Sequence, residues 1–60
     1  MTHTIDRLLE DNAHFISAVT KDNAGNVQIL EIDESLATVP ELVEIYRMAN
    51  LLGICIWRKL

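Results

Sequence analysis

The stretch TVPELVEIYRMANLLGICIWRKL, residues 38–60, contains a helix with two marked ends and a strand that follows it. Thr38 and Glu41 have the spacing of a capping box, in which each side chain accepts from the other residue's backbone N–H. Pro40 lies in the first turn, where its missing N–H is not needed. Gly53 suits the left-handed position that ends many helices. The stretch therefore predicts a helix between the Thr38 cap and Gly53, and then a strand.

The predicted helix has an apolar stripe, and the predicted strand has two different faces. The stripe and the residues that widen it are Leu42, Ile45, Ala49 and Leu52 with Val39, Tyr46 and Met48. Along the strand, residues 54–60, Ile54 and Ile56 point to one side, and Cys55 and Trp57 point to the other, because successive side chains alternate. We expect the two isoleucines to meet the helix stripe and Trp57 to lie on the opposite face of the sheet.

The N-terminal half predicts a short helix and a hairpin. Residues 5–12 have apolar side chains at helical spacing, and Thr4 precedes them as a plausible cap. Residues 14–21 and 27–33 are rich in strand-forming side chains, and residues 22–26 (DNAGN) between them form a dense turn signal. Residues 14–21 are apolar on both sides, which predicts a central strand that is covered on both faces.

These elements predict a single small α+β domain, residues 1–60, of the order α-β-β-α-β, with residues 1–3 frayed. We expect a three-stranded, mainly antiparallel sheet in the order 2-1-3, with the main helix packed on one face. In the alternative, the third strand docks beside the second, and that pair is parallel. The N-terminal helix or a second copy of the chain would cover the side that carries Phe15 and Trp57. The open edge of the third strand favours a homodimer.

Composition limits the partners and the compartment. The chain has nine Asp and Glu against five Lys and Arg. Because Lys and Arg supply the affinity for phosphates, nucleic acid and anionic membranes are disfavoured as partners. The longest apolar run, residues 51–57, is interrupted by Gly53 and is too short to span a bilayer. Cys55 is the only cysteine, and the N-terminus lacks a signal-peptide pattern, so we expect a cytoplasmic protein without disulfides.

No residue pattern predicts catalysis, a cofactor or a metal site. Cys55 lies between isoleucines, where an inert buried thiol is usual, and His14 is expected at the start of a strand. Glu31 and Asp33 share a strand face, but sixty residues leave little room for a pocket of about 300 Å³. A small oligomeric enzyme of the tautomerase kind often uses an N-terminal proline, whereas Thr2 occupies that position here. We therefore expect no enzyme.

The function that this pattern favours is a non-enzymatic protein-interaction module, a small acidic regulator or inhibitor that binds a larger cytoplasmic protein. Its partner would present a basic patch, and aromatic residues would anchor the contact. The candidate residues are Glu31, Asp33, Glu34, Glu41, Glu44, Tyr46 and Trp57. The alternative is a homo-oligomeric structural or assembly subunit, whose self-interface would be the third strand edge or the Cys55/Trp57 face.

The layout of hairpin (residues 14–33), helix (residues 39–52) and closing strand (residues 54–60) is similar to that of small phage-encoded proteins that inhibit host enzymes, such as inhibitors of bacterial RNA polymerase. This resemblance is one of layout. It implies inhibition of a host enzyme as one form of the expected function and assigns no role to any residue.

Overall fold

Helices and strands follow one another in the predicted order in a computed structural model that describes residues 4–59. The elements are α1 (Thr4–Asp11), β1 (Ile16–Lys21), β2 (Val27–Ile32), the 3-10 helix η1 (Glu34–Leu36), α2 (Val39–Leu52) and β3 (Cys55–Arg58). The small α+β fold is thus confirmed. The expected fraying of residues 1–3 lies outside the described residues, as does the last residue of the predicted third strand, Leu60. None of the helices described in residues 4–59 has the length and apolar character needed to cross a membrane.

Both predicted ends of the main helix are confirmed. The Thr38 hydroxyl accepts from the Glu41 N–H at 3.3 Å, and the Glu41 carboxylate accepts from the Thr38 N–H at 2.8 Å. At the other end Gly53 has a φ of 74°, and its N–H donates to the Ala49 and Asn50 carbonyls. A residue with a side chain would be strained in that left-handed conformation. The sequence therefore determines where α2 begins and ends through local contacts alone.

The predicted hairpin is also confirmed, and Asp22 organises its turn. The Asp22 carboxylate accepts from the backbone N–H groups of Asn26 at 2.8 Å and Ala24 at 2.9 Å. These hydrogen bonds, that from the Asn26 N–H foremost, hold the pKa of Asp22 below its usual value. Gly25 takes a φ of 87°, which glycine adopts without strain. β1 and β2 then pair antiparallel.

The predicted strand order 2-1-3 is wrong. The order is β1-β2-β3, with β2 in the centre and β3 parallel to it, which is the alternative that the sequence left open. In β2 the side chains of Leu30 and Ile32 are fully buried, whereas every residue of β1 after Ile16 is exposed. α2 connects β2 to β3 as the crossover that a parallel pair requires. The apolar character of residues 14–21 therefore does not mark a strand that is covered on both faces.

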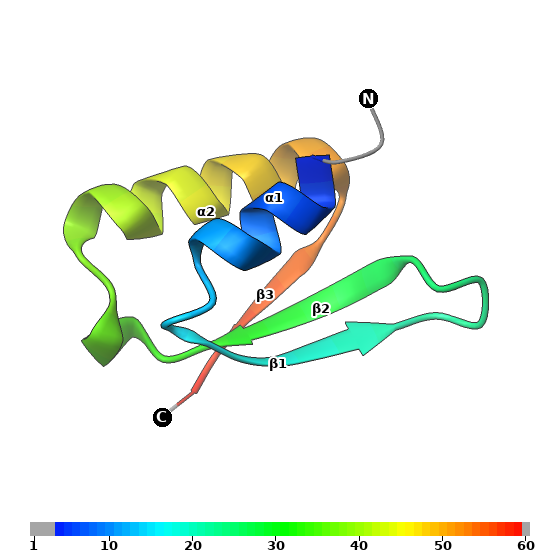
Figure 1. Cartoon of the computed structure of the whole chain (residues 1–60), viewed down its shortest axis with the longest axis horizontal. Coiled ribbons are helices and arrows are strands. Elements are labelled where there is room, and N and C mark those ends of the chain that lie inside the picture. Colours follow the sequence, from blue (N-terminus) through cyan, green and yellow to red (C-terminus); the bar gives the residue numbers. More distant parts are fainter. Residues whose placement is uncertain (1–3, 60) are drawn as a thin grey trace.

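Both helices lie on the same face of the sheet, with α1 beside α2 (Figure 1). The core between the helices and the sheet consists of Leu8, Phe15, Leu30, Ile32, Ile45, Ala49 and Ile54. The expectation that α1 would cover a side shared by Phe15 and Trp57 is wrong, because Phe15 is 1% exposed and Trp57 is 64% exposed. Phe15 precedes β1, and the register shifts between Ile16 and Ala18, so strand alternation does not extend back to Phe15.

Candidate functional site

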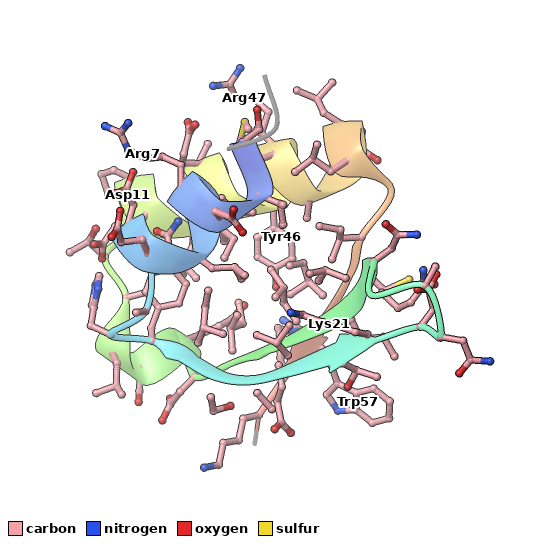
Figure 2. All side chains as sticks on the ribbon, turned by 45° about the vertical axis from the view of Figure 1, so that its right-hand side comes forward. Arg7, Asp11, Lys21, Tyr46, Arg47 and Trp57 are labelled. Carbon is pink, nitrogen blue, oxygen red and sulfur yellow. The ribbon has the colours of Figure 1, made fainter. Side chains whose placement is uncertain are left out.

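The face of the sheet opposite the helices carries the candidate site. The pairing register places two side chains of each strand on this bare face: Ala18 and Thr20 of β1, Ile29 and Glu31 of β2, and Cys55 and Trp57 of β3. Trp57 lies directly opposite Glu31, and its indole projects from the sheet on the side away from the helices (Figure 2). The predicted position of Trp57 opposite α2 is therefore confirmed. The N-terminal helix does not cover this face as one expectation had it, because no residue among 4–59 packs over it.

Glu31 and Cys55 flank Trp57 on the bare face. The Ser17 hydroxyl donates to the Glu31 carbonyl at 3.1 Å and to its carboxylate at 3.4 Å, a long hydrogen bond that leaves most of the carboxylate's accepting capacity unused. Cys55 is exposed, so the expectation of a buried thiol is wrong. Its isoleucine neighbours point toward the helices, whereas Cys55 points toward the uncovered side.

Asp33 has a structural role at the end of β2. Its carboxylate accepts from the Ser35 hydroxyl at 2.6 Å and from the Ser35 N–H at 3.1 Å, and in this way it caps η1. These two hydrogen bonds, with a smaller contribution from the positive charge of Lys59, lower the pKa of Asp33. The strand face that Asp33 was expected to share with Glu31 does not extend this far, because β2 ends at Ile32.

Glu34 and Tyr46 form a second cluster, beside the outer edge of β3. The Tyr46 hydroxyl donates to the Glu34 carboxylate at 2.8 Å, and an Arg58 guanidinium nitrogen lies 3.9 Å from the same carboxylate. Partial burial, then the hydrogen bond to Glu34 and then the negative charge of Glu34 raise the pKa of Tyr46. The tyrosine that was expected to flank the α2 stripe is therefore fixed against the segment that leads into α2, on the side where β3 lies.

Glu41 and Glu44 lie on the side of α2 that faces α1. Glu41 accepts from Thr38 and lies 2.9 Å from the His14 imidazole, and Glu44 pairs with Arg47 at 3.0 Å. An open groove of about 630 Å³ runs here between the helices. It is lined by Thr4, Arg7, Leu8, Asp11, Asn12, Pro40, Glu41, Glu44 and Met48. The argument that the chain has little room for such a volume is therefore wrong, but the suspected carboxylate pair Glu31 and Asp33 lies elsewhere.

Removal of the Glu41 charge is expected to make the free energy of unfolding depend less steeply on pH in the acidic range. The Thr38 N–H, and then His14, hold the pKa of Glu41 below its usual value of about 4.5. A carboxyl group whose pKa is lowered by folding stabilises the fold above its unfolded pKa and loses this contribution as the pH falls through its folded pKa. Glu41→Gln keeps an acceptor for the Thr38 N–H but cannot titrate. Urea denaturation from pH 7 to pH 2 should show the two curves differing in slope only below about pH 4.5; identical slopes throughout would contradict this role.

The five candidate carboxylates do not form one acidic patch. The structure brings Glu31 beside Trp57 and Glu34 beside Tyr46, but it separates these pairs from each other and from the groove. Sequence reasoning also missed an apolar row on α2. Val39 and Val43 are exposed, and with Tyr46 they lie on the flank of α2 away from α1. The spacing of four and then three residues signals such a row, which the broad stripe concealed.

Within residues 4–59, no three His, Cys, Asp or Glu side chains lie together in a way that could hold a metal ion. Comparisons of the chain with models of protein families, with curated proteins and with solved structures found no match.

Proposed function

We propose that the chain is a non-enzymatic protein-interaction module, a small regulator or inhibitor that binds a larger cytoplasmic protein through the bare face of its sheet. One observation carries the proposal: Trp57 is 64% exposed on the edge strand β3, on a face that no described residue covers. Tryptophan offers the largest apolar surface of any side chain, and it is enriched among the residues that dominate the energy of protein interfaces. An exposed tryptophan on β3 is therefore a natural anchor for a partner.

Glu31 gives this anchor a preference for a basic partner. Its carboxylate lies across from the indole in the pairing of β2 with β3. An arginine side chain could stack on the indole and donate to this carboxylate at the same time. The net charge of −4 also favours encounter with a basic surface. The proposed contact is thus an arginine-containing segment of the partner lying across Trp57.

The other acidic candidates take a smaller part in this proposal. Asp33 caps η1, Glu34 binds Tyr46, and Glu41 closes the capping box of α2. A carboxylate that already accepts hydrogen bonds within the chain must lose them, or share them, when a partner binds. The proposed contact therefore rests on Glu31 and Trp57 rather than on all five carboxylates.

Trp57→Ala is expected to reduce capture of the partner by about 30-fold or more, because truncation of an interface anchor typically costs about 2 kcal/mol or more. The measurement is quantitative capture from an extract of the native host with the immobilised chain, followed by titration of the recovered protein. Leu51→Ala is the matched control, since Leu51 is 69% exposed but lies on α2. Equal capture by both variants and the unmodified chain would refute the proposed face.

Charge reversal tests the same contact from its polar side. Glu31→Lys should abolish capture, because it places a positive charge where the partner's arginine is expected. Glu44→Lys, on the helix side, should leave capture within about twofold, since a single charge far from the contact acts mainly on the encounter rate. If Trp57→Ala changed the assembly state and not capture, the alternative of a homo-oligomeric subunit with this face as its self-interface would be favoured.

A further inference from the structure

The outer edge of β3 presents unused backbone groups in a regular pattern. The Lys59 N–H donates to the Ile32 carbonyl of β2 at 2.7 Å. Successive residues of a strand direct their N–H and C=O to opposite sides. Trp57, two positions from Lys59, therefore also directs its N–H and C=O toward β2. The N–H and C=O of Ile56 and Arg58 therefore point outward, where residues 4–59 offer them no strand.

The other edge of the sheet is less suited to adding a strand. The pairing of β1 with β2 contains two register shifts, and Lys21 lies at the second of them. Irregular pairing and an edge lysine are features that prevent further strands from docking. β3 pairs with β2 from Cys55 to Arg58 in unbroken register. An additional strand therefore has one regular edge available, that of β3.

We propose that β3 pairs antiparallel with β3 of a second copy of this chain, across a two-fold axis at Trp57. The free groups of Ile56 and Arg58 lie on either side of that axis. A half-turn about Trp57 places the N–H and C=O of Ile56 against those of Arg58 in the second copy, so each free donor meets a free acceptor. An edge with this arrangement is its own complement, which is the requirement for a symmetric dimer.

The same axis gives the most suitable register. A shift of the axis to Ile56 would place Arg58 against Ile54 of the second copy, but the Ile54 N–H already donates to the Ala49 carbonyl at 2.8 Å. With the axis at Trp57, the indole meets its own copy in a non-hydrogen-bonded pair, where side chains approach most closely. No two like charges lie directly opposite in this register, because Arg58 faces Ile56 and Lys59 faces Cys55.

The exposed flank of α2 adds apolar area to this interface. Tyr46 is bonded to Glu34, which lies beside Arg58 of β3, so the row of Val39, Val43 and Tyr46 is on the side of the β3 edge. A standard interface covers about 800 Å² of each partner, which is about a fifth of the 4376 Å² exposed here. A strand of four residues cannot supply that area alone, so the α2 row must contribute the remainder.

This inference goes beyond the proposed function and changes its geometry. Two copies would form one continuous sheet with three strands from each chain. The two Trp57 side chains and the two Glu31 carboxylates would lie near its centre, on the same bare face. A partner with repeated basic residues would then meet a doubled surface, whereas a single copy presents half of it.

Arg58→Pro tests the pairing. Proline removes the outward N–H of Arg58 and blocks strand addition, while the bonds that Trp57 and Lys59 make toward β2 remain. Arg58→Ala is the control, because it removes the same side chain and keeps the N–H. In sedimentation equilibrium we expect the unmodified chain and Arg58→Ala to approach twice the mass of 6.8 kDa. The dissociation constant of the Arg58→Pro dimer should be roughly tenfold higher or more. A single-chain mass for the unmodified protein at hundreds of micromolar would overturn the pairing.

Two further variants keep the test decisive if Arg58→Pro does not fold. Val43→Lys places a charge on the exposed α2 row and should also weaken the dimer. Thr20→Arg, on the bare face of β1, should not; a dimer lost in Thr20→Arg but kept in Val43→Lys would show face-to-face association and overturn the inference. Capture of a partner is measured separately: an unmodified chain that binds the partner as a monomer would contradict the pairing and leave the proposed function standing, whereas a dimer that captures no partner would do the reverse.

The register has its own test. In a Cys55→Ser background, Trp57→Cys should form an intermolecular disulfide under a mild oxidant such as oxidised glutathione, because a non-hydrogen-bonded pair brings the two Cα atoms within disulfide range. Cys55 of the unmodified chain faces Lys59 of the second copy and should not cross-link under the same conditions. Cross-linking through Cys55 instead would contradict an axis at Trp57.

Discussion

Phe15→Ala is expected to remove most of the stability of this fold, whereas Trp57→Ala leaves it nearly intact. Phe15 is 1% exposed beneath the helices, and truncation of a buried phenylalanine costs about 3–5 kcal/mol through lost burial and the cavity that remains. At about 0.05–0.15 kcal/mol per residue, a chain of sixty residues has a total stability of about 3–9 kcal/mol. The substitution should therefore populate the unfolded state at room temperature.

The comparison with Trp57→Ala makes this a test of the topology. The indole is largely exposed on the bare face, so its loss should cost about 1 kcal/mol or less, mainly through lower strand propensity. Urea denaturation followed by circular dichroism measures both variants, and repetition at several protein concentrations separates folding from association. Equal destabilisation by the two substitutions would place both aromatic residues in the core and contradict the arrangement of the helices.

Ile45→Ala is expected to have the second largest effect. Ile45 is fully buried where α2 packs on the sheet, and isoleucine to alanine substitutions in a core cost about 2–5 kcal/mol. Val43 lies two positions earlier on the same helix and is 61% exposed. At protein concentrations too low for the proposed dimer to form, Val43→Ala should change the free energy of unfolding by no more than about 0.5 kcal/mol, since exposed sites tolerate substitution and alanine favours helix.

Both substituted residues lie inside α2, but only Ile45 is buried. Thermal unfolding of the two variants therefore isolates the contribution of packing. A midpoint for Ile45→Ala close to that of Val43→Ala would mean that α2 does not sit on the sheet through Ile45. The unmodified chain and both variants should keep the capping contacts of Thr38 and Glu41, because neither substituted side chain takes part in them.

The elements that the sequence predicted well are those determined by neighbours in the chain. Thr38 and Glu41 close a capping box within one turn, and Gly53 ends the helix through its own backbone conformation. Asp22 and Gly25 form the hairpin turn in the same local way. Each of these contacts depends on residues a few positions apart, so one stretch of sequence contains all the information required.

Strand order depends on contacts that are remote in sequence, and there the prediction was wrong. Apolar side chains on both sides of residues 14–21 suggested burial on both faces, but the helices cover only one face, and β1 is an edge strand. The central strand is β2, whose Leu30 and Ile32 are fully buried in the same core cluster as Ile45 of α2, and composition does not reveal this arrangement. Phe15 itself precedes β1, and the register shifts between Ile16 and Ala18, so strand alternation is no guide to the side on which Phe15 lies.

For the candidate site, the sequence identified residue types but not the contacts that each residue makes. Trp57 was correctly placed on the side of the sheet away from α2, because alternation from Ile54 and Ile56 is reliable over so short a strand. The sequence alone does not distinguish a carboxylate that caps a helix from one that is free to bind a partner. Only the geometry shows that Asp33 and Glu41 have internal hydrogen bonds, and that the carboxylate of Glu31 has one long contact.

The parallel pairing of β3 with β2 separates the folding of this chain into a fast and a slow closure. The β1–β2 hairpin joins strands across a short turn, from Lys21 to Val27. The β2–β3 pair joins Ile29 to Cys55, and the connection that must close between them includes all of α2. Contacts of such sequence separation dominate the entropic barrier to folding. The docking of β3 is thus expected to be the slower of the two closures.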